Sequence, residues 1–406
     1  MALTGNLRPA AQPRPRRVAI LGSTGSVGCN TVELIERNRD AFVVEALTAN
    51  AKVELLADQA RRLRARFAVV ADPSRYRALK DALAGTDVET AAGPEALVEA
   101  ASRQSEWVMA AIVGAAGLAP TLAAVRRGAV VGLANKEALV CAGALVMQSV
   151  RESGGTLLPV DSEHSAIFQV FDFERPEQIG RIVLTASGGP FRNWSLADMA
   201  AATPEQAVAH PNWDMGAKIS VDSATMMNKG LELIEAAHLF PVPHERIEIV
   251  VHPQSVIHSM VGYVDGSVLA QLGSPDMRTP IGFALAWPQR MATPAEQIDF
   301  SRLSALTFEA PDPVRFPALR LAREALEAGG SVPTVLNAAN EVAVAAFLTK
   351  RIGFLDIARS VEDTLARMAA EPRIDGPLRT LEDVFAVDAE ARRRAGEIVQ
   401  RHAANS

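Results

Sequence analysis

The feature that most constrains this chain is a glycine-rich run, Gly22-Ser23-Thr24-Gly25-Ser26-Val27-Gly28, which directly follows the apolar segment Val18–Leu21. A helical pattern begins where the run ends, so the glycines stand between a strand and a helix. Glycine there permits a tight turn, lets backbone N–H groups approach a pyrophosphate and allows close packing of helix on strand. The alternative is a glycine turn without a ligand. The strand–turn–helix context favours a dinucleotide site.

The rest of the N-terminal third alternates apolar runs with segments whose apolar residues recur every three or four positions. This alternation is typical of parallel βαβ units, so residues 17–160 are predicted to form a doubly wound, Rossmann-like parallel sheet domain of α/β class. The further strands expected are Phe42–Ala49, Phe67–Ala71, Trp107–Val113, Ala129–Leu133 and Leu157–Val160. The helices expected between them include Val32–Arg39, Val53–Arg64 and Glu137–Arg151.

Three further regions follow, and a tail precedes the first domain. Residues 161–290 are predicted to be a central α+β catalytic and dimerisation domain, in which Asp265-Gly266 gives a strong hairpin signal. Residues 291–316 are predicted to be a linker, residues 317–406 a C-terminal helical bundle, and residues 1–16 a disordered tail. The elements expected are strands Ile182–Thr185, Ile247–Val251, Val256–Val264 and Ser267–Leu272, and helices Ala318–Ala328, Val335–Thr349, Leu355–Met368 and Leu381–His402.

Composition narrows the classes of protein to consider. A formal net charge of -6 argues against wholesale nucleic-acid binding, which needs a basic surface. The longest uncharged stretch, Trp107–Val125, is divided by glycines and a proline, so no membrane span is expected. Two cysteines, Cys29 and Cys141, are too few for a disulfide framework and predict a reduced, cytoplasmic protein.

The end of the second expected strand bears on the choice of cofactor. NAD sites place an acidic residue there to bind the ribose hydroxyls. This chain instead has Asn50 and Lys52. The missing acid and the nearby lysine favour a 2′-phosphate, and therefore NADPH, as the cofactor.

Charged residues follow two of the expected strands. Asp161 and Glu163 are two residues apart, so in an extended chain both carboxylates would point the same way and attract Mg²⁺ or Mn²⁺. The alternative is a solvated turn or a helix cap. Asn135, Lys136 and Glu137 follow a parallel strand where open α/β sheets bind ligands, and Lys136 is either an oxyanion contact or a surface lysine.

Three runs in the second half carry further candidates. Ser187 lies in a glycine-rich strand end that suits a phosphate or a sugar hydroxyl, or is a simple loop. Residues 210–216 hold His210, Trp213 and a hinge glycine, and are either a closing lid or a surface loop. In residues 220–232, hydroxyl, amide and ammonium groups gather where a helix begins, as in an anion pocket; the alternative is a capped helix with solvated Lys229 and Glu232.

Seven motifs, in order, resemble one known family: GSTGSVG, LANKEALV, PVDSEHSAIFQ, SGGPFR, HPNWDMGAKISVDSATMMNKGLE, HPQSVIHSMV and LNAANEVAV. The resemblance is to the 1-deoxy-D-xylulose 5-phosphate reductoisomerase family, and it runs from Arg17 to about Ala395. It implies NADPH- and divalent-metal-dependent isomerisation and reduction of 1-deoxy-D-xylulose 5-phosphate to 2-C-methyl-D-erythritol 4-phosphate, in the non-mevalonate isoprenoid pathway. It also implies a homodimer and a small phosphorylated sugar as substrate.

The resemblance assigns a role to each matching residue. The metal triad it implies is Asp161, Glu163 and Glu232. The phosphate pocket it implies is Ser187, Ser223, Asn228 and Lys229, with His210 close by. Ser162 and Lys136 match contacts to the reacting oxygens, and Trp213 and Met215 lie on the family's lid. Cofactor contacts are expected from Gly22, Thr24, Gly25, Ser26, Val27, Asn50, Lys52, Asn135, Glu137 and Gly216, with Glu137 also near the substrate.

Two segments depart from the family pattern, and one receives no role. Asn50-Ala51-Lys52 replaces a glycine-containing segment, which leaves the 2′-phosphate contacts open, and Asp172–Gly180 is short. The family's C-terminal helices are structural, so Asn337–Glu341 is assigned no catalytic part. Two other classes of protein remain as alternatives: another NADP-linked dehydrogenase, which would not need the metal triad, and a non-catalytic dinucleotide sensor, which would not need the phosphate pocket.

Overall fold

The computed structural model describes residues 14–211, 213, 215–369 and 378–405, and the chain forms two compact units. Unit 1 takes in Met1–Ala138, Val146–Ser165 and Asp276–Glu296. Unit 2 takes in Leu139–Leu145, Ala166–Pro275 and Gln297–Ser406. The tail predicted for residues 1–16 lies outside the described residues as far as residue 13.

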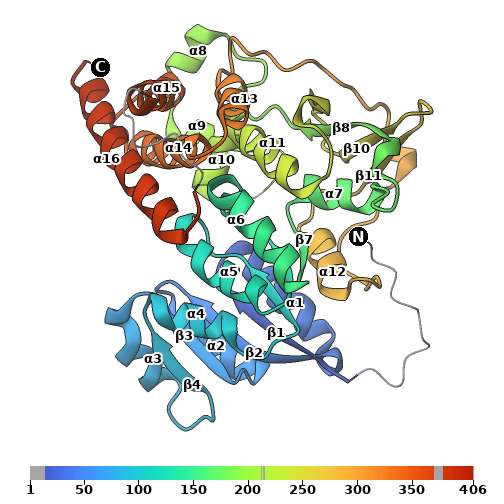
Figure 1. Ribbon diagram of the computed structural model, residues 1–406, viewed down its shortest axis with the longest axis vertical. Helices are drawn as coiled ribbons and strands as arrows, with labels where there is room; N and C mark the ends of the chain where they lie inside the picture. The colour runs from blue at the N-terminus through green and yellow to red at the C-terminus, as the bar shows by residue number, and fades with distance from the viewer. Residues whose placement is uncertain (1–13, 212, 214, 370–377, 406) are drawn as a thin grey trace. The chain divides into compact units, whose positions relative to one another are not determined.

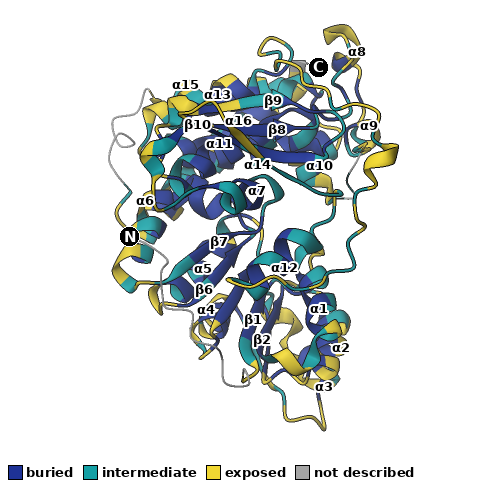
Figure 2. Ribbon diagram, turned by 90° about the vertical axis from the view of Figure 1, so that its right-hand side faces the viewer, coloured by how far each residue is buried: buried dark blue, intermediate teal, exposed yellow. Residues whose placement is uncertain are grey.

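Unit 1 is built on a seven-stranded parallel sheet, which confirms the α/β class predicted for this part of the chain. Its order is β4-β3-β2-β1-β5-β6-β7. The strands are β1 Arg16–Leu21, β2 Phe42–Ala49, β3 Phe67–Val70, β4 Glu89–Ala92, β5 Trp107–Ala110, β6 Val130–Leu133 and β7 Thr156–Pro159. Figure 2 shows these strands mostly as buried, as expected for parallel strands covered on both faces.

The strand order reverses at β1, because β2 pairs with one side of it and β5 with the other. Open α/β sheets bind ligands at such a switch point, beyond the carboxyl ends of the strands. The glycine run follows β1, and it therefore lies at the switch point.

Helices cover this sheet on both faces (Figure 1). They are α1 Ser26–Arg37, α2 Val53–Leu63, α3 Tyr76–Ala82, α4 Pro94–Ser102, α5 Leu118–Arg126 and α12 Arg278–Ala286. Helix α12 comes from a distant part of the sequence and packs against α1. Arg278 lies 3.3 Å from Glu33, and the buried Trp107 indole donates to the Ala284 carbonyl at 2.9 Å.

Unit 2 contains a mixed four-stranded sheet in the order β11-β10-β8-β9. Its strands are β8 Ile179–Ala186, β9 Ile247–Val251, β10 Ile257–Tyr263 and β11 Val268–Leu272. Strands β10 and β11 form the hairpin predicted from Asp265-Gly266, in which Gly266 has a φ of +89°. The positive φ explains the need for glycine at that turn.

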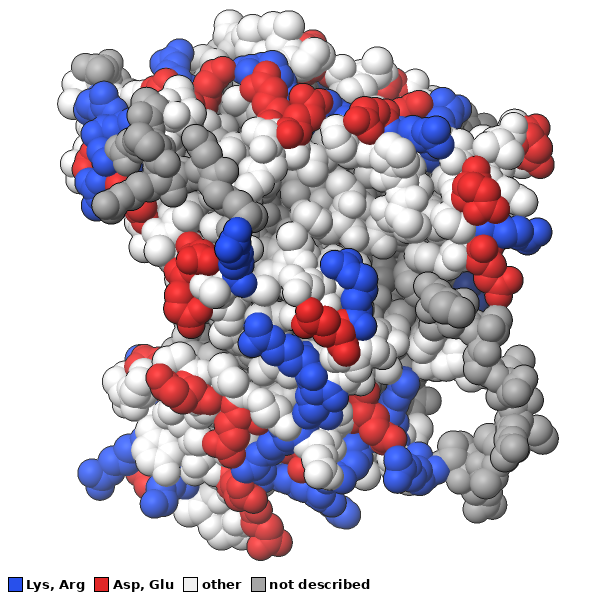
Figure 3. Space-filling view, in the orientation of Figure 1, with Lys and Arg blue, Asp and Glu red and all other residues white. Residues whose placement is uncertain are grey.

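The helices of unit 2 include those predicted for the C-terminal bundle. They are α8 Leu196–Ala200, α9 Pro204–Ala207, α10 Ala217–Ala224, α11 Met227–Leu239, α13 Ala318–Ala328, α14 Val332–Leu348, α15 Leu355–Ala369 and α16 Leu381–Asn405. Two more helices, α6 Glu137–Ser153 and α7 Ser162–Val170, have residues in both units. Within the described part of the chain, no helix is both long and apolar enough to cross a membrane. Figure 3 shows basic and acidic side chains interspersed on the drawn face.

Candidate active site

The glycine run after β1 leaves no room for side chains at two positions. Gly22 has a φ of +86°, and a Cβ there would lie 2.7 Å from the Ala111 carbonyl oxygen. A Cβ on Gly28 would lie 2.2 Å from the Gly22 carbonyl oxygen. Helix α1 begins after Gly25, and this N-cap residue has no side chain to cap the first amides. The bare positive end of the helix is therefore suited to bind an anion such as a pyrophosphate.

Two neighbouring elements hold this loop in place. The Thr48 hydroxyl of β2 accepts the Gly22 N–H at 2.9 Å. The Gln59 amide of α2 accepts the Ser23 hydroxyl at 2.7 Å and donates to the Ser23 carbonyl at 2.9 Å. Sequence reasoning missed Gln59, although a polar residue on the apolar face of Val53–Leu63 is a detectable signal.

The two residues expected at the 2′-phosphate lie at the end of β2. Asn50 and Lys52 are both exposed, and Lys52 precedes the first residue of α2. Because β2 pairs in parallel with β1, its end lies beside the glycine run. Their place at the sheet edge is compatible with cofactor contacts, which remain a prediction.

Asn135, Lys136 and Glu137 follow β6 and are all buried. The Asn135 amide donates to the carbonyls of Ile112 and Gly114, at 2.6 and 3.1 Å, so it fixes the loop after β5. The Lys136 ammonium lies 2.9 Å from the Asp161 carboxylate. The interpretation of Lys136 as a surface lysine is therefore wrong.

Asp161 precedes α7, and the two carboxylates are not carried on an extended chain as expected. Strand β7 ends at Pro159, and Glu163 lies in the first turn of α7. Asp161 Oδ1 accepts the Glu163 N–H at 3.1 Å and lies 3.0 Å from His164 Nδ1, while Oδ2 faces Lys136. Ser162 donates its hydroxyl to Glu163 at 2.6 Å. Asp161 thus caps a helix with one oxygen and presents the other to a buried ammonium.

In unit 2, the strand end after β8 brings Ser187 to His210. The Ser187 hydroxyl lies 2.9 Å from His210 Nε2, and the Trp213 N–H donates to His210 Nδ1 at 3.0 Å. Since Nδ1 accepts, a neutral His210 carries its proton on Nε2 and can donate it to Ser187. Gly188 and Gly189 have φ of +84° and +68°, so the loop needs glycine at both positions.

The turn from α10 to α11 gathers the remaining predicted pocket residues. Ser223 lies near the end of α10, while Asn228, Lys229 and Glu232 lie in the first two turns of α11. Glu232 is fully buried; its carboxylate accepts from the Asn228 amide at 2.5 Å and pairs with the Lys229 ammonium. The alternative of a solvated lysine–glutamate pair is therefore wrong, because both side chains are buried and pair with each other.

The expected lid is only partly described. Asn212 and Asp214 lie outside the described residues. The ring centroids of Trp213 and His258, on β10, are 6.1 Å apart, and Met215 is half-buried. Gly216 precedes α10, and no atom of the described residues lies within 4 Å of its Cβ position. Sequence reasoning gave His258 no role.

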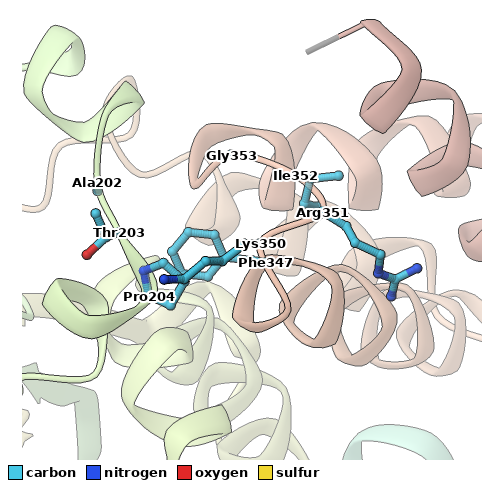
Figure 4. A pocket seen from close by; sticks show the side chains of 8 residues that line it. All are labelled: Ala202, Thr203, Pro204, Phe347, Lys350, Arg351, Ile352 and Gly353. Carbon is cyan, nitrogen blue, oxygen red and sulfur yellow. The ribbon is translucent and has the colours of Figure 1, made fainter.

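Among the described residues of unit 2, two cavities bear on the choice of an anion site. The first, of about 380 Å³, is beside the predicted phosphate pocket and includes Ser187 and Gly189 in its lining. The second, of about 320 Å³, lies between the loop before α9 and the loop after α14 (Figure 4). Its Lys350 already pairs with Glu205 at 2.7 Å, and Figure 4 shows Arg351 pointing away from Thr203. The first cavity is therefore the better candidate for an anion.

Three sequence families match the chain over most of its length. Residues 18–143 match "1-deoxy-D-xylulose 5-phosphate reductoisomerase". Residues 157–240 match "1-deoxy-D-xylulose 5-phosphate reductoisomerase C-terminal domain", and residues 272–394 match "DXP reductoisomerase C-terminal domain".

Individual relatives agree with these matches. The 1-deoxy-D-xylulose 5-phosphate reductoisomerase of Rhodospirillum centenum is 66% identical, over 95% of this chain and 94% of its own. The solved structure of the Zymomonas mobilis 1-deoxy-D-xylulose 5-phosphate reductoisomerase in complex with NADPH is 61% identical in sequence, with a TM-score of 0.90 over 95% of this chain and 99% of its own. A DOX-P reductoisomerase structure with NADPH, fosmidomycin and magnesium is 42% identical, also with a TM-score of 0.90, over 95% and 98% of the two chains.

Proposed function

This chain belongs to the 1-deoxy-D-xylulose 5-phosphate reductoisomerase family, and from that premise we propose how its residues divide the work of the reaction. It is an NADPH- and divalent-metal-dependent oxidoreductase that isomerises and reduces 1-deoxy-D-xylulose 5-phosphate to 2-C-methyl-D-erythritol 4-phosphate. The resemblance drawn from the motifs is confirmed by the relatives. The residue roles that follow are proposals.

The glycine run fits the cofactor. The uncapped start of α1, with no Cβ at Gly28, supports a pyrophosphate contact through the backbone of Thr24–Val27 and at Gly22. Asn50 and Lys52 would contact the 2′-phosphate, while Asn135, Glu137 and Gly216 would border the nicotinamide half. When bound, NADPH supplies the hydride that reduces the aldehyde.

The acidic residues fit a hard divalent cation. We assign Asp161, Glu163 and Glu232 as its ligands, as the resemblance to the family implies, since carboxylate oxygens are what Mg²⁺ and Mn²⁺ prefer. Magnesium is the metal named for a related structure, and manganese stays a prediction. When bound, the metal acts as a Lewis acid on the substrate's oxygens.

Four side chains of unit 2 would anchor the substrate phosphate: Ser187, Ser223, Asn228 and Lys229. The His210 Nε2 proton keeps the Ser187 hydroxyl in place and orients its lone pairs. A lysine and an amide at the start of α11 add charge and donors. Anchoring the phosphate lets the binding energy of a remote group orient the reacting carbons.

Lys136 and Ser162 would contact the reacting oxygens. Lys136 is buried and held by Asp161 Oδ2, so its ammonium is fixed near the carboxyl end of β7. A fixed ammonium can stabilise negative charge that develops on a substrate oxygen, and Glu137 lies next to it. Trp213 and Met215, on the lid, would exclude water from the reacting centre.

The buried Glu232 carboxylate, held by Lys229 and Asn228, is the observation that carries these assignments, because it places an acid inside a donor-rich pocket. The test is NADPH oxidation by the purified protein with 1-deoxy-D-xylulose 5-phosphate, first with Mg²⁺ and then after chelation. We expect oxidation that stops on chelation. NADPH oxidation that continues after chelation would contradict the metal assignment. No NADPH oxidation under any condition would contradict the proposed function.

Changing Glu232 tests the metal assignment directly. Glu232→Gln keeps the shape but removes the charge that a cation needs, so we expect kcat to fall by about 100-fold or more, since several kcal/mol of charge stabilisation are lost. NADPH affinity, measured by fluorescence titration, should stay near that of the parent protein. The control is Glu245→Gln, which makes the same substitution at an exposed position. Equal losses of turnover and NADPH binding would show that Glu232 has a structural role and would contradict its assignment as a metal ligand.

We also propose that the protein is a homodimer. Strand β11 is at the edge of its sheet, and Val268 and Leu269 are about half exposed on it. An apolar edge strand is a surface that proteins usually cover, and a second copy of this chain would do so. The cytoplasmic location inferred from the cysteines stays a prediction.

A further inference from the structure

One hydrogen bond ties the C-terminal helices to the helix that carries Ser223. The Asn340 amide of α14 donates to Asp222 Oδ1 of α10 at 2.8 Å. Both side chains are buried, with exposures of 0% and 1%, and the two helices pack together (Figure 1). The amide nitrogen must face Asp222, because an ionised carboxylate only accepts hydrogen bonds.

The Asp222 carboxylate also holds the start of its own helix. Its Oδ2 lies 2.8 Å from the ammonium of Lys218, which is one helical turn earlier in α10. A buried carboxylate is stable only when its oxygens are satisfied, so Lys218 and Asn340 together fix it in place. Through the Asp222 carboxylate, α14 therefore fixes α10 between Lys218 and the residue next to Ser223.

The far end of α10 packs closely against the loop that carries Ser187. A Cβ on Gly189 would lie 2.5 Å from the Ser223 carbonyl oxygen and 3.0 Å from Ala224 Cα. The Ser187 loop therefore packs directly on the backbone of α10. Movement of α10 would change the separation of the Ser187 and Ser223 hydroxyls.

We propose that Asn340 is a positioning residue for the substrate phosphate: through Asp222 it sets α10 so that Ser223 faces the same group as Ser187. The proposal rests on the function proposed above, in which these two serines bind that phosphate. Losing the hydrogen bond should weaken substrate binding and leave NADPH binding unchanged. Misplacement by about 1 Å can cost about 100-fold, so we expect a smaller shift of Ser223 to cost about tenfold.

Asn337 offers a matched control on the same helix. It is also fully buried, but its amide donates to Glu341 at 3.1 Å, within α14. Asn337→Leu and Asn340→Leu should both lower the melting temperature, because each removes a buried hydrogen bond. Only Asn340→Leu should raise the substrate KM, by about tenfold.

A pair of exchanged residues tests the hydrogen bond itself. Asn340→Asp sets two carboxylates against each other, so we expect it to be the most damaging change. Adding Asp222→Asn removes the ion pair with Lys218 but restores one donor and one acceptor between α14 and α10. It should therefore recover kcat/KM for the substrate about tenfold relative to Asn340→Asp alone. All variants are assayed as full-length protein for the KM of the substrate, the KM of NADPH and the melting temperature.

The outcomes separate the two proposals. An active parent protein whose Asn340→Leu variant matches Asn337→Leu in substrate KM would overturn the positioning role. So would a double variant no better than Asn340→Asp. A parent protein that shows no substrate-dependent NADPH oxidation would instead count against the proposed function.

Discussion

Gly28 is the residue at which the cofactor loop has the least space. Its missing Cβ would come within 2.2 Å of the Gly22 carbonyl oxygen, and the atoms in contact are backbone. Backbone cannot rotate away, and overpacking of this kind costs about 1–3 kcal/mol. We expect Gly28→Ala to lower the melting temperature and to weaken NADPH binding about tenfold, measured by fluorescence titration. Gly25→Ala should leave the melting temperature unchanged, because only one atom lies near its Cβ position, at 3.5 Å.

The sequence identified the residue types of the site better than their geometry. The donors at the start of α11 follow from a local pattern, since Asn228, Lys229 and Glu232 lie within two turns. Burial does not follow from it, and burial is what contradicts the solvated alternative for Glu232. Asn340 has no catalytic part in the prediction, because the family's C-terminal helices are structural. Its contact with Asp222 cannot be predicted from a local pattern, because the two residues are 118 positions apart and only the packing of two helices brings them together.

At the scale of elements, the contact between α11 and α6 should make the stability of the protein depend on pH. The His238 ring of α11 lies where a Cβ on Gly143 would be, 2.3 Å from its nearest ring atom, and burial lowers the pKa of His238 below its usual 6.5. As the pH falls below 6.5, the unfolded chain takes up a proton that the folded protein resists, so stability is lost toward acid. We expect the melting temperature to fall between pH 7.5 and 5.5, and less steeply in His238→Gln. His244→Gln is the control, and identical slopes would rule out His238 as the source.

The same scale shows which elements local patterns can predict. Phe42–Ala49 and Ile247–Val251 have the predicted bounds because β-branched and apolar residues fill them. Strand β4 was missed, since Glu89-Thr90-Ala91-Ala92 is a partly exposed edge with low strand propensity. Helix α1 begins at Ser26 rather than near Val32. Its first turn consists mainly of small residues that also form the glycine-rich loop, so it lacks the apolar periodicity that marks a helix.

At the scale of the whole molecule, the edge of the second sheet should determine the oligomeric state. Leu269→Lys places a charge on β11, where a partner chain would bury it. We expect this variant to elute as a monomer in size-exclusion chromatography with light scattering, while the parent protein elutes as a dimer. The matched control is Val314→Lys, since Val314 is 74% exposed and lies outside both sheets. If the Leu269→Lys variant is still a dimer, the interface does not include β11.

The position of helix α12 in the sequence determines what a truncation of the coding sequence would remove. The segment Asp276–Glu296 belongs to unit 1, although more than a hundred residues of unit 2 separate it from β7. A transcript ending before codon 276 would encode every strand of the parallel sheet and still leave α1 without its neighbour and the Trp107 indole without its acceptor. Unit 1 is therefore encoded by stretches of the reading frame that unit 2 interrupts, and an allele shortened before codon 276 would truncate both units.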